Sequence, residues 1–229
     1  MSGVRRAAFF DVDETLITAK SMFEFLRHWL ALNGDDGSEY RERAAELRGI
    51  AARGLPREVG NRLYYRAFAG APVAAVLAAG RAWYGDYRRR PDAFVTAGVA
   101  ALARHRAAGD EVVLVSGSFE ACLRPLALDL GADRVLCSEP LVGEDGRYTG
   151  MTGTSMIGEA KSLAVARTIG ELGLRAGDCY GYGDHSSDLD MLDAVGHPVV
   201  IGADPVLNER AQERGWPVLS AAGGGREQI

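Results

Sequence analysis

A buried strand that ends in a cluster of carboxylates is the feature that most limits how this chain can fold. Residues 7–17 read AAFFDVDETLI, so four apolar residues lead directly into Asp11, Asp13 and Glu14 before the chain becomes apolar again. A continuous apolar run is typical of a strand inside a parallel sheet, and here it predicts a strand over 6–13. Carboxylates so close together repel one another, so this strand end requires a nearby positive charge.

Strands and helices alternate in the second part of the chain. The pattern predicts strands over 111–117, 134–139, 178–184 and 198–202, a hairpin over 141–153, and helices over 92–108, 119–130, 159–172, from about 186, and over 205–214. Such alternation is typical of a doubly wound parallel sheet with helices on both faces, a Rossmann-like α/β fold. Ligands bind at the carboxyl ends of the strands in these sheets.

The segment that follows the first strand has a different pattern. Between residues 18 and 91, apolar side chains recur at helical spacing and glycines or prolines separate the runs. This predicts an all-helical block without strands. Ser21 and Glu24 are spaced as a capping box for its first helix. Basic residues outnumber acidic ones in this block, whereas the rest of the chain is acidic.

The changes of pattern divide the chain into two domains. We expect a discontinuous core domain built from residues 1–17 and 92–219, with an inserted helical domain at 18–91. The glycine-rich end, 220–229, is expected to be a disordered tail.

The composition argues against several classes of protein. No apolar run approaches the ~20 residues of a membrane-spanning helix, and the first residues lack the layout of a secretion signal. Three cysteines without a CxxC pair indicate neither a disulfide framework nor a zinc site. The net charge is −5 and no basic, aromatic-rich stripe occurs, which argues against nucleic-acid binding. We expect a soluble cytoplasmic protein, a monomer or a homodimer, whose partner is neither a membrane nor a nucleic acid.

Four carboxylates stand at the predicted strand ends or just after them. Asp11 and Asp13 end the first strand, Asp184 ends a later one, and Asp188 lies one helical turn further on. These groups cannot all ionise in one crevice without a cation, and oxygen ligands suit Mg²⁺. A carboxylate beside such a cation can attack a phosphate ester, and Asp13 can donate a proton to the leaving oxygen and then activate water.

Other polar residues complete this chemistry. Ser116 ends a predicted strand, and its hydroxyl, with the amides of Gly117 and Ser118, can hold phosphoryl oxygens. Lys161 can place a compact positive charge where negative charge develops. The chain strongly prefers arginine, since only Lys20 and Lys161 among its 26 basic residues are lysines. A lysine at this place therefore stands out.

These residues also form a family signature. The motif DVDET resembles the DxDx[TV] motif of haloacid-dehalogenase-type phosphatases, LVSGS their second motif, Lys161 the third, and GYGDHSSDLDML the fourth, GDxxxD. The resemblance implies that Asp11 is the nucleophile, Asp13 the general acid and base, and Ser116 and Lys161 the phosphoryl-binding groups. It implies Mg²⁺ bound by Asp11, Asp184 and the backbone carbonyl of Asp13, with Asp188 in support. The helical block resembles the family's C1 cap.

Several segments look most like subfamily IB, the relatives of phosphoserine phosphatase. Those enzymes carry a glutamate nine residues after the nucleophile that receives the substrate's ammonium group, whereas this chain has Lys20 there. A lysine would repel an ammonium group. We therefore expect a small phosphorylated metabolite other than phosphoserine, with an extra anionic or neutral polar group. Arg62 is a second candidate contact to an anionic substrate.

The expected reaction is hydrolysis of a phosphomonoester, and two alternatives remain open. The same residues could transfer the phosphoryl group to a small alcohol. A non-catalytic phospho-accepting module would use similar groups, but Asp13 argues against it because a general base shortens the life of an aspartyl-phosphate. The sequence identifies neither the substrate nor its pathway.

Overall fold

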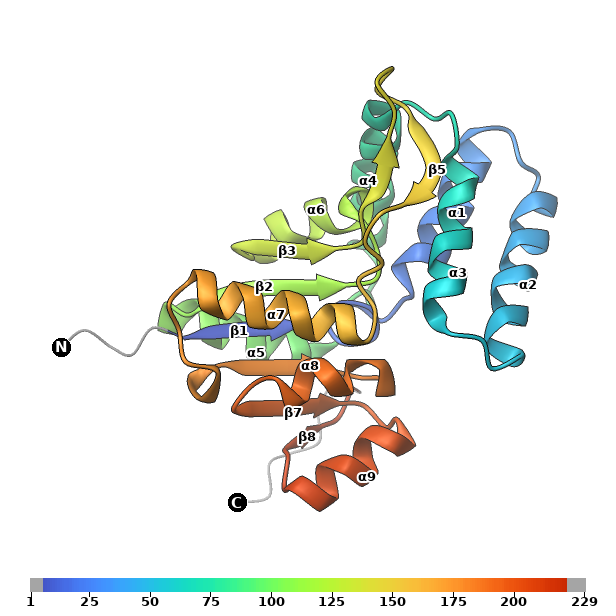
Figure 1. Ribbon diagram of the computed structural model, residues 1–229. Helices are drawn as coiled ribbons and strands as arrows, with labels where there is room; N and C mark the ends of the chain where they lie inside the picture. Colours follow the sequence, from blue (N-terminus) through green and yellow to red (C-terminus); the bar gives the residue numbers. More distant parts are fainter. Residues whose placement is uncertain (1–5, 222–229) are drawn as a thin grey trace.

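The computed structural model describes residues 6–221 and has a six-stranded sheet at its centre (Figure 1). In spatial order the strands are β3 (Arg134–Cys137), β2 (Glu111–Ser116), β1 (Ala7–Phe10), β6 (Tyr180–Gly183), β7 (His197–Ile201) and β8 (Val218–Leu219). Every neighbouring pair runs parallel. The sheet therefore confirms the predicted doubly wound α/β core.

Helices cover both faces of the sheet. Their bounds are α5 (Thr96–Ala108), α6 (Glu120–Leu130), α7 (Glu159–Glu171), α8 (Leu189–Asp193) and α9 (Pro205–Arg214). Ala8 and Phe10 of β1 pack in one apolar cluster with α5 and α6, whereas Ala7 and Phe9 pack in a second one with α7, α8 and α9. In Figure 1, α7 and α8 lie in front of the sheet and α6 behind it. Both faces of β1 are buried because successive side chains of a strand point in opposite directions.

All the regular elements between β1 and α5 are helices, as predicted. They are α1 (Ser21–Leu32), α2 (Ser38–Ala52), α3 (Arg57–Tyr64), the 3₁₀ turn η1 (Tyr65–Phe68) and α4 (Val73–Tyr87). The strands in Figure 1 point toward α1, α2 and α3. The predicted capping box is wrong: Ser21 is already the first helical residue, and Lys20 at the N-cap makes no side-chain capping bond.

The helical block packs against the core through α4 and α6. A Cβ atom added at Gly80 of α4 would lie 1.9 Å from the carbonyl oxygen of Ala121 in α6, so only glycine allows the two helices to approach so closely. The Tyr84 hydroxyl donates a 2.7 Å hydrogen bond to Asp129 across the same interface. Phe119, at the start of α6, packs among Phe25 and Phe68 of the block. Apolar contact therefore joins the two parts into one core.

The predicted hairpin is present, formed by antiparallel β4 (Pro140–Val142) and β5 (Tyr148–Thr152). It leaves the end of β3 and lies beside α4 in Figure 1. Backbone hydrogen bonds join Tyr148 of β5 to Gly70 and Ala71, which precede α4. The hairpin, which follows β3 of the core, is therefore hydrogen-bonded to the helical block.

Two further expectations concern membrane-spanning helices and the end of the chain. In the described range, no helix combines the length and the apolarity that crossing a bilayer requires. Of the predicted tail, 220–229, the part from residue 222 onward lies outside the described residues.

Candidate active site

The order of the strands reverses beside β1, so the chain leaves a crevice at the carboxyl ends of β1 and β6. Asp11 follows β1 directly, Ser116 is the last residue of β2, and Asp184 follows β6. The backbone N–H of Asp11 donates to the carbonyl of Tyr182 at 2.9 Å, which joins the ends of β1 and β6. Three distant segments thus bring their polar residues to one place.

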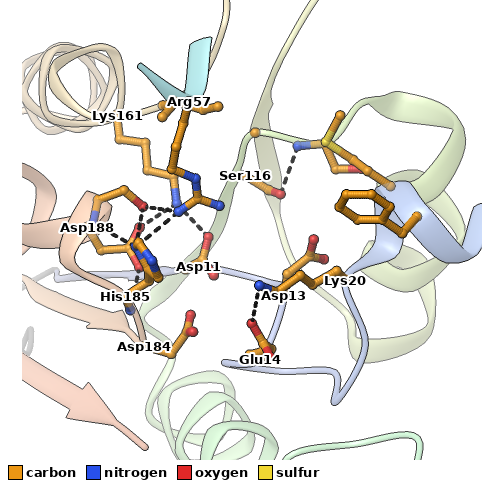
Figure 2. Close-up of a pocket in the computed structure, with 16 residues that line it drawn as sticks. Asp11, Asp13, Glu14, Lys20, Arg57, Ser116, Lys161, Asp184, His185 and Asp188 are labelled. Carbon is orange, nitrogen blue, oxygen red and sulfur yellow. Dashed lines mark hydrogen bonds and ion pairs between the residues drawn. The ribbon is translucent and has the colours of Figure 1, made fainter. Parts of the chain in front are cut away.

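A cavity of about 100 Å³ occupies this crevice (Figure 2). Most of the residues predicted for the site line it, namely Asp11, Asp13, Lys20, Ser116, Gly117, Lys161, Asp184 and Asp188. A water molecule occupies about 30 Å³ in the liquid. The cavity therefore has room for a group the size of a phosphoryl, and the remainder of a metabolite must lie outside it.

Lys161 supplies the positive charge that the first strand end requires. It lies in the first turn of α7, and its ammonium group is buried 2.5 Å from Asp11 Oδ1 and 2.6 Å from Asp188 Oδ1. Burial by itself would lower the pKa of Lys161, but the charges of the two aspartates raise it above its ordinary value. The lysine is therefore fully protonated at neutral pH, and both ion pairs form.

One lysine does not balance the acidic groups around it. Asp11, Asp184 and Asp188 each present a carboxylate oxygen within 4.8 Å of the others. Burial, followed by the charges of Asp11 and Asp188, raises the pKa of Asp184 to about 9. At neutral pH Asp184 therefore keeps its proton unless a further cation is present, and one small cation would let all three carboxylates ionise. Because all the donors are oxygens, the cluster fits a hard divalent ion such as Mg²⁺.

Asp13 has the properties of a proton donor. Its Oδ1 is buried and has no hydrogen-bond partner among the described residues. Burial, with the charge of Asp11 as the second cause, raises the pKa of Asp13 to about 7. A carboxyl group that titrates near neutral pH can both give and accept a proton under physiological conditions.

A tight loop after β1 holds these groups in place. Glu14 has a φ of 62°, a left-handed conformation that is uncommon for residues other than glycine. Its N–H donates to the carbonyl of Ile17 at 2.7 Å, which closes the loop. The Thr15 hydroxyl donates to Asp184 Oδ1 at 3.0 Å. The DVDET motif therefore positions Asp184 as well as its own aspartates.

The loop after β2 is held by the helical block. The Gly117 carbonyl accepts hydrogen bonds from Asn61 Nδ2 at 2.7 Å, Ser138 Oγ at 2.8 Å and Tyr65 OH at 3.3 Å. In a trans peptide the carbonyl and the next N–H point in opposite directions. Fixing this carbonyl therefore directs the N–H of Ser118 toward Ser116 Oγ, 3.1 Å away. Sequence reasoning missed Asn61, a polar residue that is buried in α3 together with Tyr64.

We expect Asn61→Leu to weaken both the fold and the phosphoryl-binding loop. The substitution removes one donor to Gly117 and leaves the buried hydroxyl of Ser155, which donates to Asn61 at 2.6 Å, without its acceptor. Loss of about 1–3 kcal/mol in the free energy of unfolding is expected, together with a lower kcat/KM. Urea unfolding and phosphate-release assays measure the two effects. Asn33→Ala, at an exposed helix end, is the control and should change both little.

The two predicted substrate contacts differ in position. Lys20 lies at the edge of the cavity, half-exposed, with its ammonium group 3.3 Å from Glu14 Oε2. The prediction for Arg62 is not supported, since Arg62 is exposed and lies outside the cavity lining. Arg57 lines the cavity instead, and its guanidinium contacts Ser187 Oγ at 2.7 Å and His185 Nδ1 at 3.0 Å.

The reason for this difference is helical spacing. Arg57 and Asn61 are four residues apart on α3 and share the face that meets the core, whereas Arg62 is turned about 100° away from Asn61. Pro56 is the N-cap of α3, and Arg57 is its first residue. The four-residue spacing of Arg57 and Asn61 could therefore have indicated that they share a helix face. The sequence does not show, however, which face of the helix contacts the core.

A doubly wound α/β core with a carboxylate–lysine site at its strand ends defines the class of this protein. The family model for haloacid dehalogenase-like hydrolases matches residues 8–193. The chain belongs to this family.

Individual relatives agree with that membership. A probable phosphatase of Mycobacterium tuberculosis is 34% identical over 225 residues, which cover 94% of this chain and 75% of the relative. A phosphoserine phosphatase of the same organism is 30% identical over 227 residues, covering 93% and 70%. A solved structure from Bordetella pertussis, of unknown function, is 30% identical with a TM-score of 0.84 and covers 96% of this chain and all of that one. Together with the family, the two phosphatase relatives confirm the predicted enzyme class, a phosphatase.

Proposed function

We propose that this phosphatase is a Mg²⁺-dependent phosphomonoester hydrolase that acts on a small phosphorylated metabolite through an aspartyl-phosphate. The observation that carries the proposal is the placement of Asp11. Its carboxylate pairs with Lys161 and also belongs to the acidic cluster with Asp184 and Asp188, in a cavity of phosphoryl size. One carboxylate is thus held beside both a fixed cation and a site for a second one.

The proposed reaction has two displacements at phosphorus. A carboxylate oxygen of Asp11 attacks phosphorus, the bond from phosphorus to the ester oxygen breaks, and that oxygen takes the proton of Asp13. Asp13, now ionised, accepts a proton from water as the water oxygen attacks the acyl phosphate. The bond between Asp11 and phosphorus breaks, phosphate leaves, and both aspartates return to their starting states. A pKa of about 7 for Asp13 suits both steps.

The remaining residues hold the phosphoryl oxygens and the cation. Ser116, which accepts from the Ser118 amide, and the amide of Gly117 would donate hydrogen bonds to the transferring group, and Lys161 would balance its charge. We propose that Asp11, Asp184 and the backbone carbonyl of Asp13 hold Mg²⁺, with Asp188 in support. When bound, Mg²⁺ would neutralise charge on the phosphoryl oxygens and lessen the repulsion between ester and carboxylate.

The experiment that tests this function compares stripped and reloaded protein. After treatment with EDTA, we expect no phosphate release from a panel of phosphorylated metabolites, and recovery when Mg²⁺ is restored. Full activity in the presence of EDTA would contradict the metal proposal. Failure to hydrolyse any phosphomonoester with Mg²⁺ would contradict the function itself. Repeating the assay with added small alcohols separates hydrolysis from phosphoryl transfer, because a transferase would form new esters at the expense of phosphate.

Lys20 supports the proposal that phosphoserine is a poor substrate. Phosphoserine and phosphoglycerate differ in an ammonium group and a hydroxyl group, and two like charges in proximity cost on the order of 1–4 kcal/mol. We expect kcat/KM to be higher for phosphoglycerate by at least about fivefold. Lys20→Glu should narrow or reverse that ratio. Arg62→Glu, outside the cavity lining, is the matched control. Equal hydrolysis of the two esters by the natural protein would contradict the role of Lys20.

We also propose placement in subfamily IB, with residues 18–91 as a cap inserted between the core segments 1–17 and 92–219. The run of helices α1 to α4 between β1 and α5 supports this division. The proposed setting is cytoplasmic, as a monomer or homodimer that acts on small molecules and not on nucleic acids or membranes. Size-exclusion chromatography with light scattering tests the oligomeric state.

A further inference from the structure

A second, larger cavity adjoins the site described above. It measures about 470 Å³, within the range of 300–1,000 Å³ that small-molecule sites occupy. Six residues line both cavities, so the two lie side by side: Lys20, Met22, Phe23, Arg57, Ile157 and His185. A phosphoryl group in the smaller cavity would therefore direct the rest of its ester into the larger one.

The lining of this larger cavity combines apolar walls with positive charge. Side chains from α1, α2 and α3 form the apolar part, among them Phe23, Leu47 and Ile50. The charged lining residues are Lys20, Arg48 and Arg57, and no carboxylate is among the described residues of the lining. Arg48 is exposed and has no ion-pair partner in the described part of the chain. The lining is thus suited to an acidic group.

Gly60 leaves space open in this cavity. It lies inside α3, where glycine is about 0.5–1 kcal/mol less favourable than alanine. Its φ is not positive, and an added Cβ would meet only Ile50 and Leu47, at 3.9 to 4.0 Å. Neither the backbone nor packing therefore requires glycine here. The two neighbouring side chains line the cavity, as does Gly60 itself, so a larger residue would fill it.

From these observations we infer that the leaving alcohol is a bulky hydroxy acid, with an apolar body against α2 and α3 and an acidic group that reaches Arg48. The inference rests on the proposed function and names the substrate class of that site. A molecule of this class has an apolar body to contact the apolar walls, a negative charge to pair with the cationic side chains, and enough bulk to fill the space beside Gly60. A small amino acid phosphate would leave most of the cavity empty.

The first test compares three esters with the natural protein and Mg²⁺. They are the phosphate ester of hydroxynaphthoic acid, naphthyl phosphate and phosphoglycerate. We expect kcat/KM for the hydroxynaphthoic ester to exceed that of phosphoglycerate by at least about tenfold, and that of naphthyl phosphate by about two- to fivefold. Hydroxynaphthoate alone should bind the metal-free protein in calorimetry, a result that needs no catalysis.

Two variants test whether Gly60 and Arg48 are responsible for these substrate preferences. Gly60→Leu should lower the preference for the hydroxynaphthoic ester over phosphoglycerate about tenfold. Arg48→Gln should remove its advantage over naphthyl phosphate. Both should weaken the binding of hydroxynaphthoate. The matched controls are Gly85→Leu in α4 and Arg41→Gln in α2, neither of which lines the cavity.

The outcomes separate this inference from the proposed function. If phosphoglycerate is hydrolysed but the hydroxynaphthoic ester is not preferred and its alcohol does not bind, the inference is overturned and the function stands. If none of the three esters is hydrolysed while other members of the metabolite panel are, the inference is overturned and the function stands. If no member of that panel is hydrolysed either, the function fails and the inference with it. If Gly60→Leu and Gly85→Leu behave alike, the cavity does not hold the leaving group.

Discussion

Asp11→Asn is expected to lower kcat for phosphate release by at least about a thousandfold. The amide has the shape of the carboxylate but is a poor nucleophile. It also carries no negative charge to pair with the ammonium group of Lys161. Phosphate release under saturating substrate and Mg²⁺ measures the effect. A natural-protein sample quenched during turnover should contain a phosphorylated aspartate, identified by mass spectrometry, and the variant should contain none.

Retention of more than a trace of activity in Asp11→Asn would refute the covalent mechanism. A matched control is Asp178→Asn, because Asp178 lies in a 3₁₀ turn before β6, away from the cavity lining. It should retain full activity. Urea unfolding of both variants checks that a loss of activity does not reflect a loss of fold.

Lys161→Met is expected to have the largest effect on stability. The substitution leaves Asp11 and Asp188, both buried, without the ammonium group 2.5 to 2.6 Å away. Removing one partner of a buried ion pair costs about 3–5 kcal/mol, and kcat should fall strongly as well. Because the folded state raises the pKa of Lys161, its contribution is fully present below the ordinary value of 10.5 and declines only at higher pH. Chemical unfolding at neutral pH measures the loss.

The chain contains its own control for this change. Lys20 is the only other lysine, is half-exposed and pairs with an exposed glutamate, so Lys20→Met should alter the free energy of unfolding by less than about 1 kcal/mol. Equal losses in the two variants would mean that the buried ion pairs do not stabilise the site. Added Mg²⁺ should restore part of the lost stability in Lys161→Met, since it also balances the acidic cluster.

Much of the fold could be predicted because its sheet is buried on both faces. Apolar runs such as that of β1 have no polar alternation, and turn residues bound each of them, so strand and helix positions followed from local pattern. The site at the strand ends followed from the same pattern, since parallel strands deliver Asp11, Ser116 and Asp184 to one edge.

Residues contributed by the helical block could not be predicted in the same way. Whether Arg57 or Arg62 meets the site depends on how α3 is rotated against the core, and that rotation is set by tertiary contacts such as the bond from Asn61 to Gly117. The capping box failed for a related reason. Lys20 has an extended backbone and is the N-cap of α1. The helix therefore begins at Ser21, which cannot also be its N-cap.

The hydrogen bond from Asn61 to the Gly117 carbonyl has a consequence for protein engineering. Exchanging the helices of this enzyme for those of a relative, in order to change what it accepts, would also remove a support of the loop that binds phosphoryl oxygens. A transplanted segment must therefore bring its own amide and phenol to that carbonyl. A chimera without them would lose turnover on every ester, whatever the fit of its new binding surface.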